Sequence, residues 1–360
     1  MTEAPATRGR LASLDILRGL DLFLLVFLQP VVVAFVSVSG CDGCEGLMWC
    51  LDHEVWEGFR PWDLVMPLFL FMTGAAMPFS FAHYLSGQKP RRQLYRRIAR
   101  RVVVLFIFGM IVQGNLLAFD PDHLYIYTNT LQAIAAGYLI AAVMLLNLGL
   151  RWQIAATAAL LVVYSLPMLI HGGYAPADSF AFDIDRIVLG RFRGDLTYTW
   201  VWSSLTFGAT VMMGAFAGRM MRGATNRRRV AARMAVAGVA LIAAGLALSP
   251  VEPIVKRLWT STMTLYSGGW CFLLMALFYW WVDCLGHSRG LNWLKIYGMN
   301  AITAYILGEV ISFRSVVASV SYGLEPLMGD YYPVWLTFGN YLILFLILFY
   351  MYRKNIFLKV

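Results

Sequence analysis

Residues 10–40 read RLASLDILRGLDLFLLVFLQPVVVAFVSVSG, and this stretch decides the class of fold. Its apolar part, 16–38, is longer than the roughly 20 residues that a helix needs to cross a bilayer. The whole chain repeats this pattern, since its 360 residues are 60% hydrophobic and 14% charged, with a mean hydropathy of +0.66. A soluble domain has about 25% charged residues. The sequence therefore predicts an all-α, polytopic integral membrane protein.

Ten apolar segments are typical of transmembrane spans. They are expected at 16–38, 63–85, 102–119, 128–148, 153–171, 200–221, 230–249, 262–283, 296–313 and 335–352. No soluble domain, low-complexity tract or internal repeat separates them, so residues 1–360 are expected to form a single transmembrane domain. The first apolar run is long enough to span, and we therefore expect no cleavable signal peptide.

Basic clusters fall at alternate connections between these spans, above all at 89–101 and 222–233. Most acidic residues fall on the opposite side. Because basic loops stay in the cytoplasm, both termini are predicted to be cytoplasmic. The outward loops are then 39–62, 172–199, 250–261 and 314–334. The net charge of +9 is explained by orientation and does not indicate a nucleic-acid partner, although a basic loop can also bind a polyphosphate or lipid headgroups.

Charged residues inside spans are costly and mark functional sites. Asp15, Arg18 and Asp21 recur every three residues in the first span, so neighbours along this row can touch. Gln29 lies eleven residues and roughly 16 Å beyond Arg18 on the same helix face. This face predicts a polar stripe that crosses the membrane. An interfacial ion pair with one interhelical hydrogen bond is the simpler alternative.

Later spans contribute further polar side chains, namely Gln113, Asn115, Asn129, Gln132, Asn300 and Glu309. Asn129 and Gln132 are three residues apart and share a helix face, and Glu309 lies about 13 Å along its helix from Asn300. So many polar groups in one bundle predict a cavity that they line. Amides can also simply join helices in a membrane, which is the alternative reading.

The segment LDHEVWEGFRPWDLVMPLFLFMTG, residues 51–74, places His53 on the outward side, ten residues before Asp63. An imidazole titrates near neutral pH and suits proton transfer from an attacking amine. A neighbouring carboxylate would orient it. Trp56 and Trp62 are candidates for a sugar platform. An exposed histidine without catalytic function is the alternative.

Three of the five cysteines crowd the first outward loop, in CDGCEGLMWCLDH at 41–53. A disulfide is expected outside the cytoplasm, with its pairing among Cys41, Cys44 and Cys50 left open. The same run reads C-x2-C-x5-C-x2-H, which is the spacing of a Cys₃His zinc site. Zinc would occupy His53 and remove it from catalysis. We expect the disulfide and no metal.

Five blocks of the sequence together resemble one known family. They are RLASLDILRGLDL (10–22), HEVWEGFRPWDLVMPLFLFMTGAAMPFS (53–80), NTLQAIAAGYL (129–139), PIVKRLWTSTMTL (253–265) and YGMNAITAYILGEV (297–310). Their order and content are similar to the transmembrane acyltransferase family of heparan-α-glucosaminide N-acetyltransferase. The bacterial NagX-like members are expected to be the nearest kin.

The resemblance implies acetyl transfer from cytoplasmic acetyl-coenzyme A to a periplasmic amino sugar or small glycan, in a bacterial inner membrane. By residue match, His53 takes the place of the family's catalytic histidine. Gln29 stands where the lysosomal enzyme has an active-site asparagine, and its amide would stabilise the developing oxyanion. Asp63 completes the predicted catalytic set. Whether a covalent acetyl-histidine forms stays open.

The remaining polar and aromatic residues are assigned to the two substrates. Asp15, Arg18 and Asn300 are expected to bind acetyl-coenzyme A. The acceptor is expected to contact Trp56, Trp62, Asn129, Gln132, Trp259 and Glu309. Expected partners are membrane lipids and, by resemblance, a second copy in a homodimer. A secondary transporter for an amino sugar is the competing function, although the chain lacks the inverted repeat common in transporters.

Overall fold

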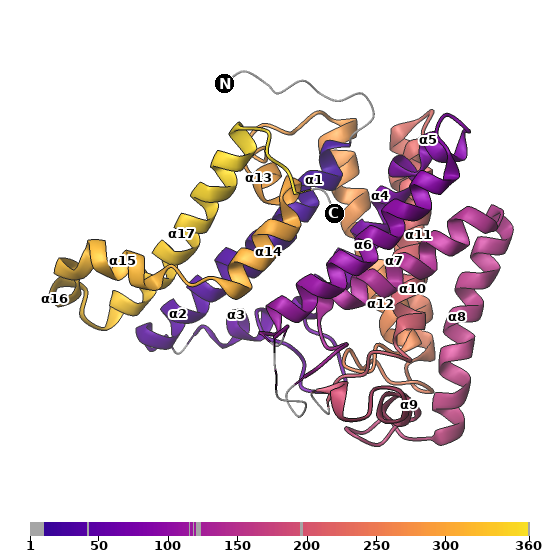
Figure 1. The fold of residues 1–360 in the computed structure, drawn as a ribbon, viewed down its shortest axis with the longest axis horizontal. Coiled ribbons are helices and arrows are strands. Elements are labelled where there is room, and N and C mark those ends of the chain that lie inside the picture. Colours follow the sequence, from indigo (N-terminus) through magenta and orange to yellow (C-terminus); the bar gives the residue numbers. More distant parts are fainter. Residues whose placement is uncertain are drawn as a thin grey trace.

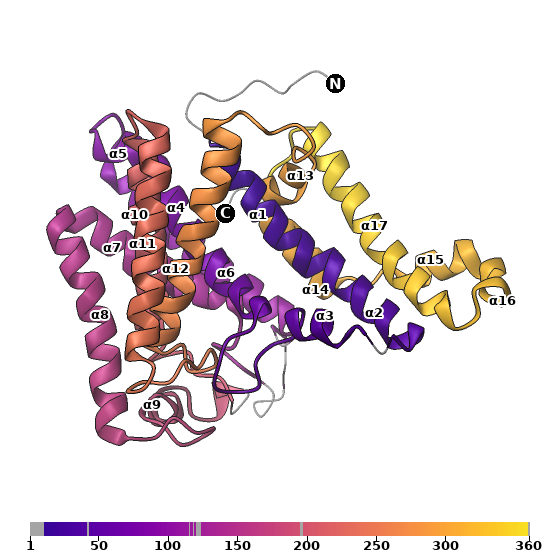
Figure 2. The same cartoon turned by 180° about the vertical axis from the view of Figure 1, so that it is seen from behind.

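The computed structural model of this protein describes residues 11–41, 43–114, 116–117, 119, 124–194 and 197–358. Within these ranges the fold is helical throughout, with two isolated β-bridges and no strand (Figures 1 and 2). The predicted all-α class is therefore confirmed. The hydrocarbon core of a membrane contains no water, and this explains the helical class, because a helix satisfies its backbone hydrogen bonds within one segment.

Helices lie at the positions of the predicted spans. In chain order they are α1 with η1 and α2 (Ala12–Phe23, Leu24–Leu28, Gln29–Ser39), η2 with α4 (Pro61–Leu64, Val65–Ser80), α6 (Arg91–Val112), α7 (Thr130–Asn147), α8 (Leu150–His171), α10 (Ser204–Arg222), α11 (Arg227–Leu248), α12 with η4 (Ser261–Phe278, Tyr279–Cys284), α13 with α14 (Leu294–Met299, Ala301–Val310) and α17 (Tyr332–Arg353).

Among the described residues, seven helical segments are long and apolar enough to cross a membrane. They are Ala12–Ser39, Pro61–Ser80, Thr130–Asn147, Leu150–His171, Arg227–Leu248, Ser261–Cys284 and Arg314–Arg353. The chain is thus a multi-pass membrane protein. Helices α6, α10 and α14 fall outside this set; α6 begins with a run of arginines, and α14 has only 10 residues. The predicted count of ten spans stays a prediction.

Helices α4 and α10 pack closely against each other in the bundle. A Cβ atom added at Gly74 would lie 1.8 Å from the carbonyl oxygen of Val211, and one at Gly214 would lie 1.8 Å from that of Phe71. Small residues let helix backbones touch in this way. Helix α4 is therefore held against α10 with no room for a side chain between them.

Helices α1, α13, α14 and α17 form a second, slanted group beside this bundle (Figures 1 and 2). The expected single span at 296–313 is broken at Asn300, whose backbone (φ −117°, ψ 37°) separates α13 from α14. The break lies beside a close contact with α1, where a Cβ atom added at Gly298 would lie 1.9 Å from the carbonyl oxygen of Asp15. The break places a predicted site residue at a helix junction.

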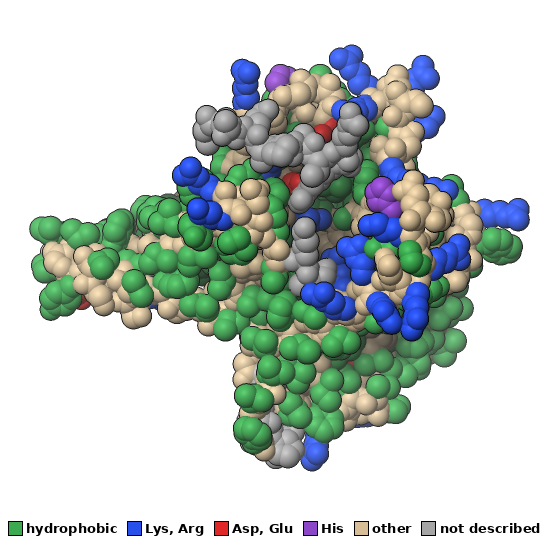
Figure 3. Space-filling model, turned by 45° about the horizontal axis from the view of Figure 1, so that its top comes forward, with side chains coloured by type: hydrophobic (Ala, Val, Ile, Leu, Met, Phe, Trp, Pro, Cys, Tyr) green, Lys and Arg blue, Asp and Glu red, His purple; other side chains and the backbone are tan. Residues whose placement is uncertain are grey.

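The two ends of the molecule differ in composition. The start of α1, the end of α17, the short helix α5 (Ala82–Leu85) and the start of α6 share one end, and α9 (Phe180–Leu189) lies at the other (Figure 1). Figure 3 shows lysine and arginine side chains gathered at the first end. We call it the basic end. That it faces the cytoplasm, with both termini, stays a prediction.

Three of the four predicted outward loops, 39–62, 172–199 and 314–334, contain short helices. These are α3 (Glu45–Cys50), α9 with η3 (Gly190–Arg193), and α15 (Arg314–Ser321) with η5 (Tyr322–Leu324), α16 (Glu325–Met328) and η6 (Gly329–Tyr331). Helices α15 and α16 project sideways as an apolar arm (Figures 1 and 3). Val320 and Leu327 are among its most exposed side chains.

Candidate active site

His53 and Asp63 form the centre of the site. Asp63 belongs to η2, the turn that starts α4, and is completely buried. Its Oδ1 lies 2.8 Å from His53 Nδ1, and its Oδ2 accepts the backbone N–H groups of Arg60 and Glu54 at 3.0 and 3.1 Å. A carboxylate at a helix start is stabilised by the unpaired N–H groups there. The imidazole itself stays half-exposed, so one ring edge is fixed while the other can meet a substrate.

Lys256 is a third member of this centre that the sequence did not single out. Its Nζ lies 2.8 Å from His53 Nδ1, 3.3 Å from His53 Nε2 and 3.1 Å from Asp63 Oδ1. Burial lowers the pKa of Lys256 to about 8; Asp63 opposes this shift, and the neighbouring Arg257 adds to it. A basic residue in a predicted outward loop, inside the block PIVKRLW, was the available signal.

Two loops far apart in sequence meet to bring Lys256 to the histidine. Gly58 N donates to the carbonyl of Ile254 at 2.9 Å, and Glu57 forms an isolated β-bridge with Val255. The following residue is Lys256. The lysine is therefore positioned by backbone pairing rather than by its own flexible side chain.

Ion pairs fix the loop that carries the histidine. The Arg60 guanidinium contacts Glu54 Oε2 at 3.1 Å and Asp52 Oδ2 at 3.3 Å, and it lies 5.9 Å from the centre of the Trp49 ring. The charged residues that precede α4 thus brace each other. His53, between Asp52 and Glu54 in sequence, is held in a defined position.

Gln29 reaches the same loop from the first helix. Its Nε2 donates to the carbonyl of Leu51 at 3.4 Å, two residues before His53. Gln29 begins α2, directly after the π-turn η1. The structure therefore brings all three predicted catalytic residues to one region, although Gln29 does not line the main cavity.

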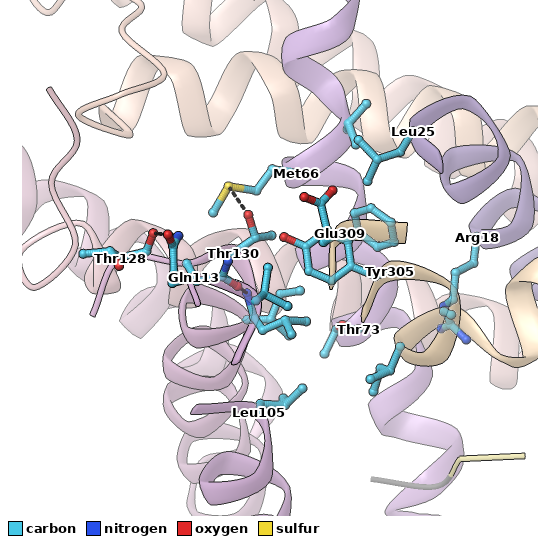
Figure 4. Close-up of a pocket in the computed structure, with 18 of the residues that line it drawn as sticks. Arg18, Leu25, Met66, Thr73, Leu105, Gln113, Thr128, Thr130, Tyr305 and Glu309 are labelled. Carbon is cyan, nitrogen blue, oxygen red and sulfur yellow. Dashed lines mark hydrogen bonds between the residues drawn. The ribbon is translucent and has the colours of Figure 1, made fainter. Parts of the chain in front are cut away.

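A cavity of about 820 Å³ leads away from His53 into the membrane part of the protein. Its size suits a small-molecule ligand. His53, Lys256 and Gln113 line it together with Arg18, Arg97 and Arg101 of the basic half, and Figure 4 shows Arg18 and the Gln113–Thr128 pair on opposite sides of it. Between them Figure 4 shows the apolar side chains of Leu25, Met66 and Leu105 together with the polar ones of Thr73, Thr130, Tyr305 and Glu309. One cavity thus connects three arginines with the imidazole.

The three arginines are held in different ways. Arg18 contacts Asp15 at 3.9 Å and the carbonyl of Met72 at 3.5 Å. Arg97 donates to the Tyr84 hydroxyl at 3.0 Å. The Arg101 guanidinium lies 4.6 Å from the centre of the Tyr138 ring, and its buried Nε has no hydrogen-bond partner among the described residues. A planar guanidinium suits phosphate oxygens.

Of the predicted donor-binding residues, only Arg18 lines the cavity. Asp15 is buried beside Arg18. Asn300 is also buried, and neither its Nδ2 nor its Oδ1 has a hydrogen-bond partner in the described part of the chain. Its neighbours Met299 and Ala301 line the cavity. Asn300 therefore lies beside the cavity wall.

Of the predicted acceptor-binding residues, Trp62, Asn129 and Glu309 line the cavity. Asn129 is also the N-cap of α7, where its side chain accepts Leu131 N at 2.8 Å. Figure 4 shows the Glu309 carboxylate beside Tyr305. These three residues are accessible to a ligand from within.

The other three predicted acceptor residues make contacts inside the protein and do not line the cavity. Trp56 Nε1 donates to the carbonyl of Tyr174 at 2.7 Å, and Trp259 Nε1 donates to Thr210 Oγ1 at 3.3 Å. Gln132 completes the cap of α7 by accepting Thr128 N at 2.8 Å. Contact of these residues with a substrate stays a prediction. Asn115, also predicted from its span, lies outside the described residues.

The structure pairs Cys41 with Cys44 in a disulfide and leaves Cys50 free. The prediction of a disulfide in this loop is confirmed, and its pairing is assigned. Two of the four ligands that a zinc site would need, Cys41 and Cys44, are thereby bonded to each other. Over the described ranges, no cluster of histidine, cysteine, aspartate and glutamate side chains is arranged to hold a metal ion.

A family model described as "Heparan-alpha-glucosaminide N-acetyltransferase, catalytic" matches residues 10–247, about two thirds of the chain. The chain belongs to this family. The resemblance stated from the five sequence blocks is thereby confirmed. His53, Asp63, Gln29 and the three cavity arginines lie inside the matched range of this heparan-alpha-glucosaminide N-acetyltransferase family member, whereas Lys256 lies beyond it.

Two relatives carry the same name. The chain is 30% identical over 138 residues to heparan-alpha-glucosaminide N-acetyltransferase of Homo sapiens, and 29% identical over 147 residues to that of Mus musculus. These matches cover 38% and 39% of this family member but only 19% and 20% of the relatives. The chain thus aligns with about a fifth of their length.

Proposed function

We propose that this chain is a membrane-embedded acetyltransferase that moves an acetyl group from acetyl-coenzyme A to the amino group of an amino sugar or small glycan. The observation that carries the proposal is the single cavity between the three arginines and the pair His53 and Asp63. Family membership supports it. The donor enters from the basic end, and the acceptor meets it at the histidine.

The donor fits the cavity by its chemistry. Coenzyme A carries several phosphates at one end and a thioester on a long arm at the other. Arg18, Arg97 and Arg101 would hold the phosphates, and the unpartnered Nε of Arg101 is a donor available to one of them. Asp15 would orient Arg18, and Asn300 would act at the adjoining wall. The apolar side chains in the middle of the cavity would contact the long arm of the coenzyme, and the acetyl group would then lie near His53.

His53 would act as the general base. A carboxylate only accepts hydrogen bonds, so His53 Nδ1 carries the proton that faces Asp63, and Nε2 is left with a lone pair. Nε2 takes a proton from the amine as its nitrogen forms a bond to the acetyl carbon. The carbon–sulfur bond breaks, and the coenzyme leaves as the thiol after it receives the proton. An oxyanion role for the Gln29 amide stays a prediction, because Gln29 does not line the cavity and its Nε2 donates to the carbonyl of Leu51.

Lys256 would make the reaction depend on pH. Its pKa is lowered from the usual value of about 10.4 to about 8, so it is charged below pH 8 and neutral above it. A charged ammonium only donates hydrogen bonds, so below pH 8 it competes with the substrate amine for the Nε2 lone pair of His53, 3.3 Å away. Transfer is therefore expected to be held back on the acid side of pH 8 and to be released on the alkaline side.

The variant Lys256→Met tests this role, because methionine keeps the length of the side chain without its charge. We expect the ratio of variant to wild-type rate to exceed one at pH 6.5, by about threefold, and to fall toward one as pH rises through 8. Because the acceptor amine titrates in the same way in both measurements, its titration does not change the ratio of the two rates. A ratio that does not change with pH would contradict this role for Lys256.

Transfer across a membrane tests the function itself. Protein reconstituted in one orientation receives labelled acetyl-coenzyme A on the face of the basic end and glucosamine on the opposite face. We expect labelled N-acetylglucosamine on the acceptor side. If label appears only when both substrates share one face, the transmembrane route is wrong. Uptake of unmodified sugar without any donor would instead favour the transporter, which the comparisons do not support.

The cellular setting belongs to the same proposal. A periplasmic acceptor and a cytoplasmic donor require a bacterial inner membrane with the basic end and both termini inside. The ten spans, the NagX-like kinship, the contact with lipids and the homodimer are also part of this proposal.

A further inference from the structure

We propose that the His53 end of the cavity contains a subsite for one pyranose ring of the acceptor, built from Gln113, Thr128, Tyr198 and Trp200. We call these four residues the acceptor subsite. The inference rests on the proposed function and specifies where its second substrate binds. None of the four was predicted as an acceptor contact from the sequence.

The four residues come from three segments. Gln113 ends α6, Thr128 precedes α7, and Tyr198 and Trp200 follow η3. Gln113 Nε2 donates to the carbonyl of Thr128 at 2.9 Å, which ties two of these segments together (Figure 4). All four line the same cavity as His53.

Backbone and cation–π contacts bring the third segment toward the catalytic centre. Thr199 N donates to the carbonyl of Arg257 at 3.1 Å, and the Arg257 guanidinium lies 5.3 Å from the centre of the Tyr198 ring. Arg257 directly follows Lys256, whose Nζ is 2.8 Å from His53 Nδ1. A sugar ring held by Tyr198 and Trp200 would therefore lie near the imidazole of His53.

Two buried polar groups of the subsite lack a partner. Trp200 is only 6% exposed, yet its indole Nε1 has no hydrogen-bond acceptor among the described residues. The same holds for the buried hydroxyl of Thr128. Leaving such groups unpaired costs about 1–3 kcal/mol each, so a native protein normally supplies a partner. The hydroxyl oxygens of a sugar ring are acceptors of the required kind.

The aromatic part of the subsite is rigid. The rings of Tyr198 and Trp200 are stacked, with their centroids 5.9 Å apart and their planes at 25°. The centroid of the Tyr127 ring lies 5.8 Å from that of Trp200. The Asp185 carboxylate accepts Trp200 N at 2.8 Å and Val201 N at 2.9 Å. A fixed aromatic surface with a polar edge suits a pyranose, which has an apolar C–H face and hydroxyls at its rim.

The charge of the subsite separates it from the donor end. None of its four side chains carries a charge at neutral pH, whereas Arg18, Arg97 and Arg101 line the other end of the cavity. Phosphates would therefore bind at the arginines, and an uncharged, hydroxyl-rich ring would bind beside the histidine.

The variants Trp200→Phe and Thr128→Val test the subsite. Thr128→Val removes one hydrogen-bonding group and keeps the shape, whereas Trp200→Phe removes the indole N–H together with one ring of the side chain. We expect each to raise the KM for glucosamine about fivefold and to leave the KM for acetyl-coenzyme A unchanged, as one lost hydrogen bond of about 1 kcal/mol implies. Arg101→Gln is the matched control and should raise only the donor KM. An unchanged donor KM also shows that the variants fold.

Equilibrium binding of labelled glucosamine to purified protein separates this inference from the proposed function. Weaker binding to Trp200→Phe than to wild type supports the subsite even if no transfer occurs, and in that case only the acetyltransferase proposal fails. Wild-type binding and wild-type acceptor KM in both variants would overturn the subsite, whatever the transfer activity.

Discussion

Replacing His53 with alanine is expected to lower the rate of acetyl transfer about 10³-fold, with donor binding nearly unchanged. The His53 imidazole lines the cavity, with Asp63 bonded to Nδ1 and with Nε2 as the nitrogen that can accept a proton. Loss of a general base removes about 10²–10⁴ of rate. The measurement is kcat with labelled acetyl-coenzyme A, together with the dissociation constant of the donor.

His83→Ala serves as the control, because His83 lies on α5 at the basic end and its Nδ1 contacts Gln88 at 2.7 Å. It should transfer acetyl groups at the wild-type rate. The catalytic assignment of His53 is wrong if His53→Ala keeps more than about a tenth of the activity.

Replacing Asp63 with asparagine should have an effect of similar size for a different reason. Two backbone N–H groups point at Oδ2, so the asparagine oxygen would take that position and its NH₂ would face His53. His53 Nδ1 would then have to accept a hydrogen bond, and the ring proton would move to Nε2. A base with its lone pair turned away is inactive, and we expect kcat to fall by about 10²–10⁴.

The control for this variant is Asp52→Asn, which removes a carboxylate from the exposed side of the same loop, where it contacts Arg60, and leaves an oxygen that can still accept the backbone N–H of His53. It should change kcat by less than about threefold. The donor KM of Asp63→Asn, measured alongside, checks that the cavity is intact. If kcat falls by less than tenfold, Asp63 does not set the tautomer of His53.

The positions of the helices could be predicted from the sequence because apolar runs are a strong local signal. The breaks could not. The junction at Asn300 depends on contact with α1, where a Cβ atom at Gly298 would lie 1.9 Å from the carbonyl oxygen of Asp15. The helices α15 and α16 replace an expected loop, since their apolar residues are too short a run to read as a span.

The contact between His53 and Asp63 could also be predicted, because the two residues are ten positions apart in one motif. Lys256 could not, since 203 residues separate it from His53 and only the pairing of two loops joins them. The tryptophans show the same limit. The sequence does not reveal that the N–H groups of Trp56 and Trp259 bond within the protein, or that Trp200 lines the cavity with its N–H unpartnered.

The glycine contact between α4 and α10 has a consequence for how a turnover proceeds. Asp63 stands at the head of α4, and that helix cannot slide or roll against α10 without a steric clash. His53 and Asp63, which would transfer the proton, thus belong to the part of the molecule that we expect to stay fixed. We expect any opening that admits the proposed donor or releases its product to come from the slanted group, with the helix break at Asn300 as its pivot.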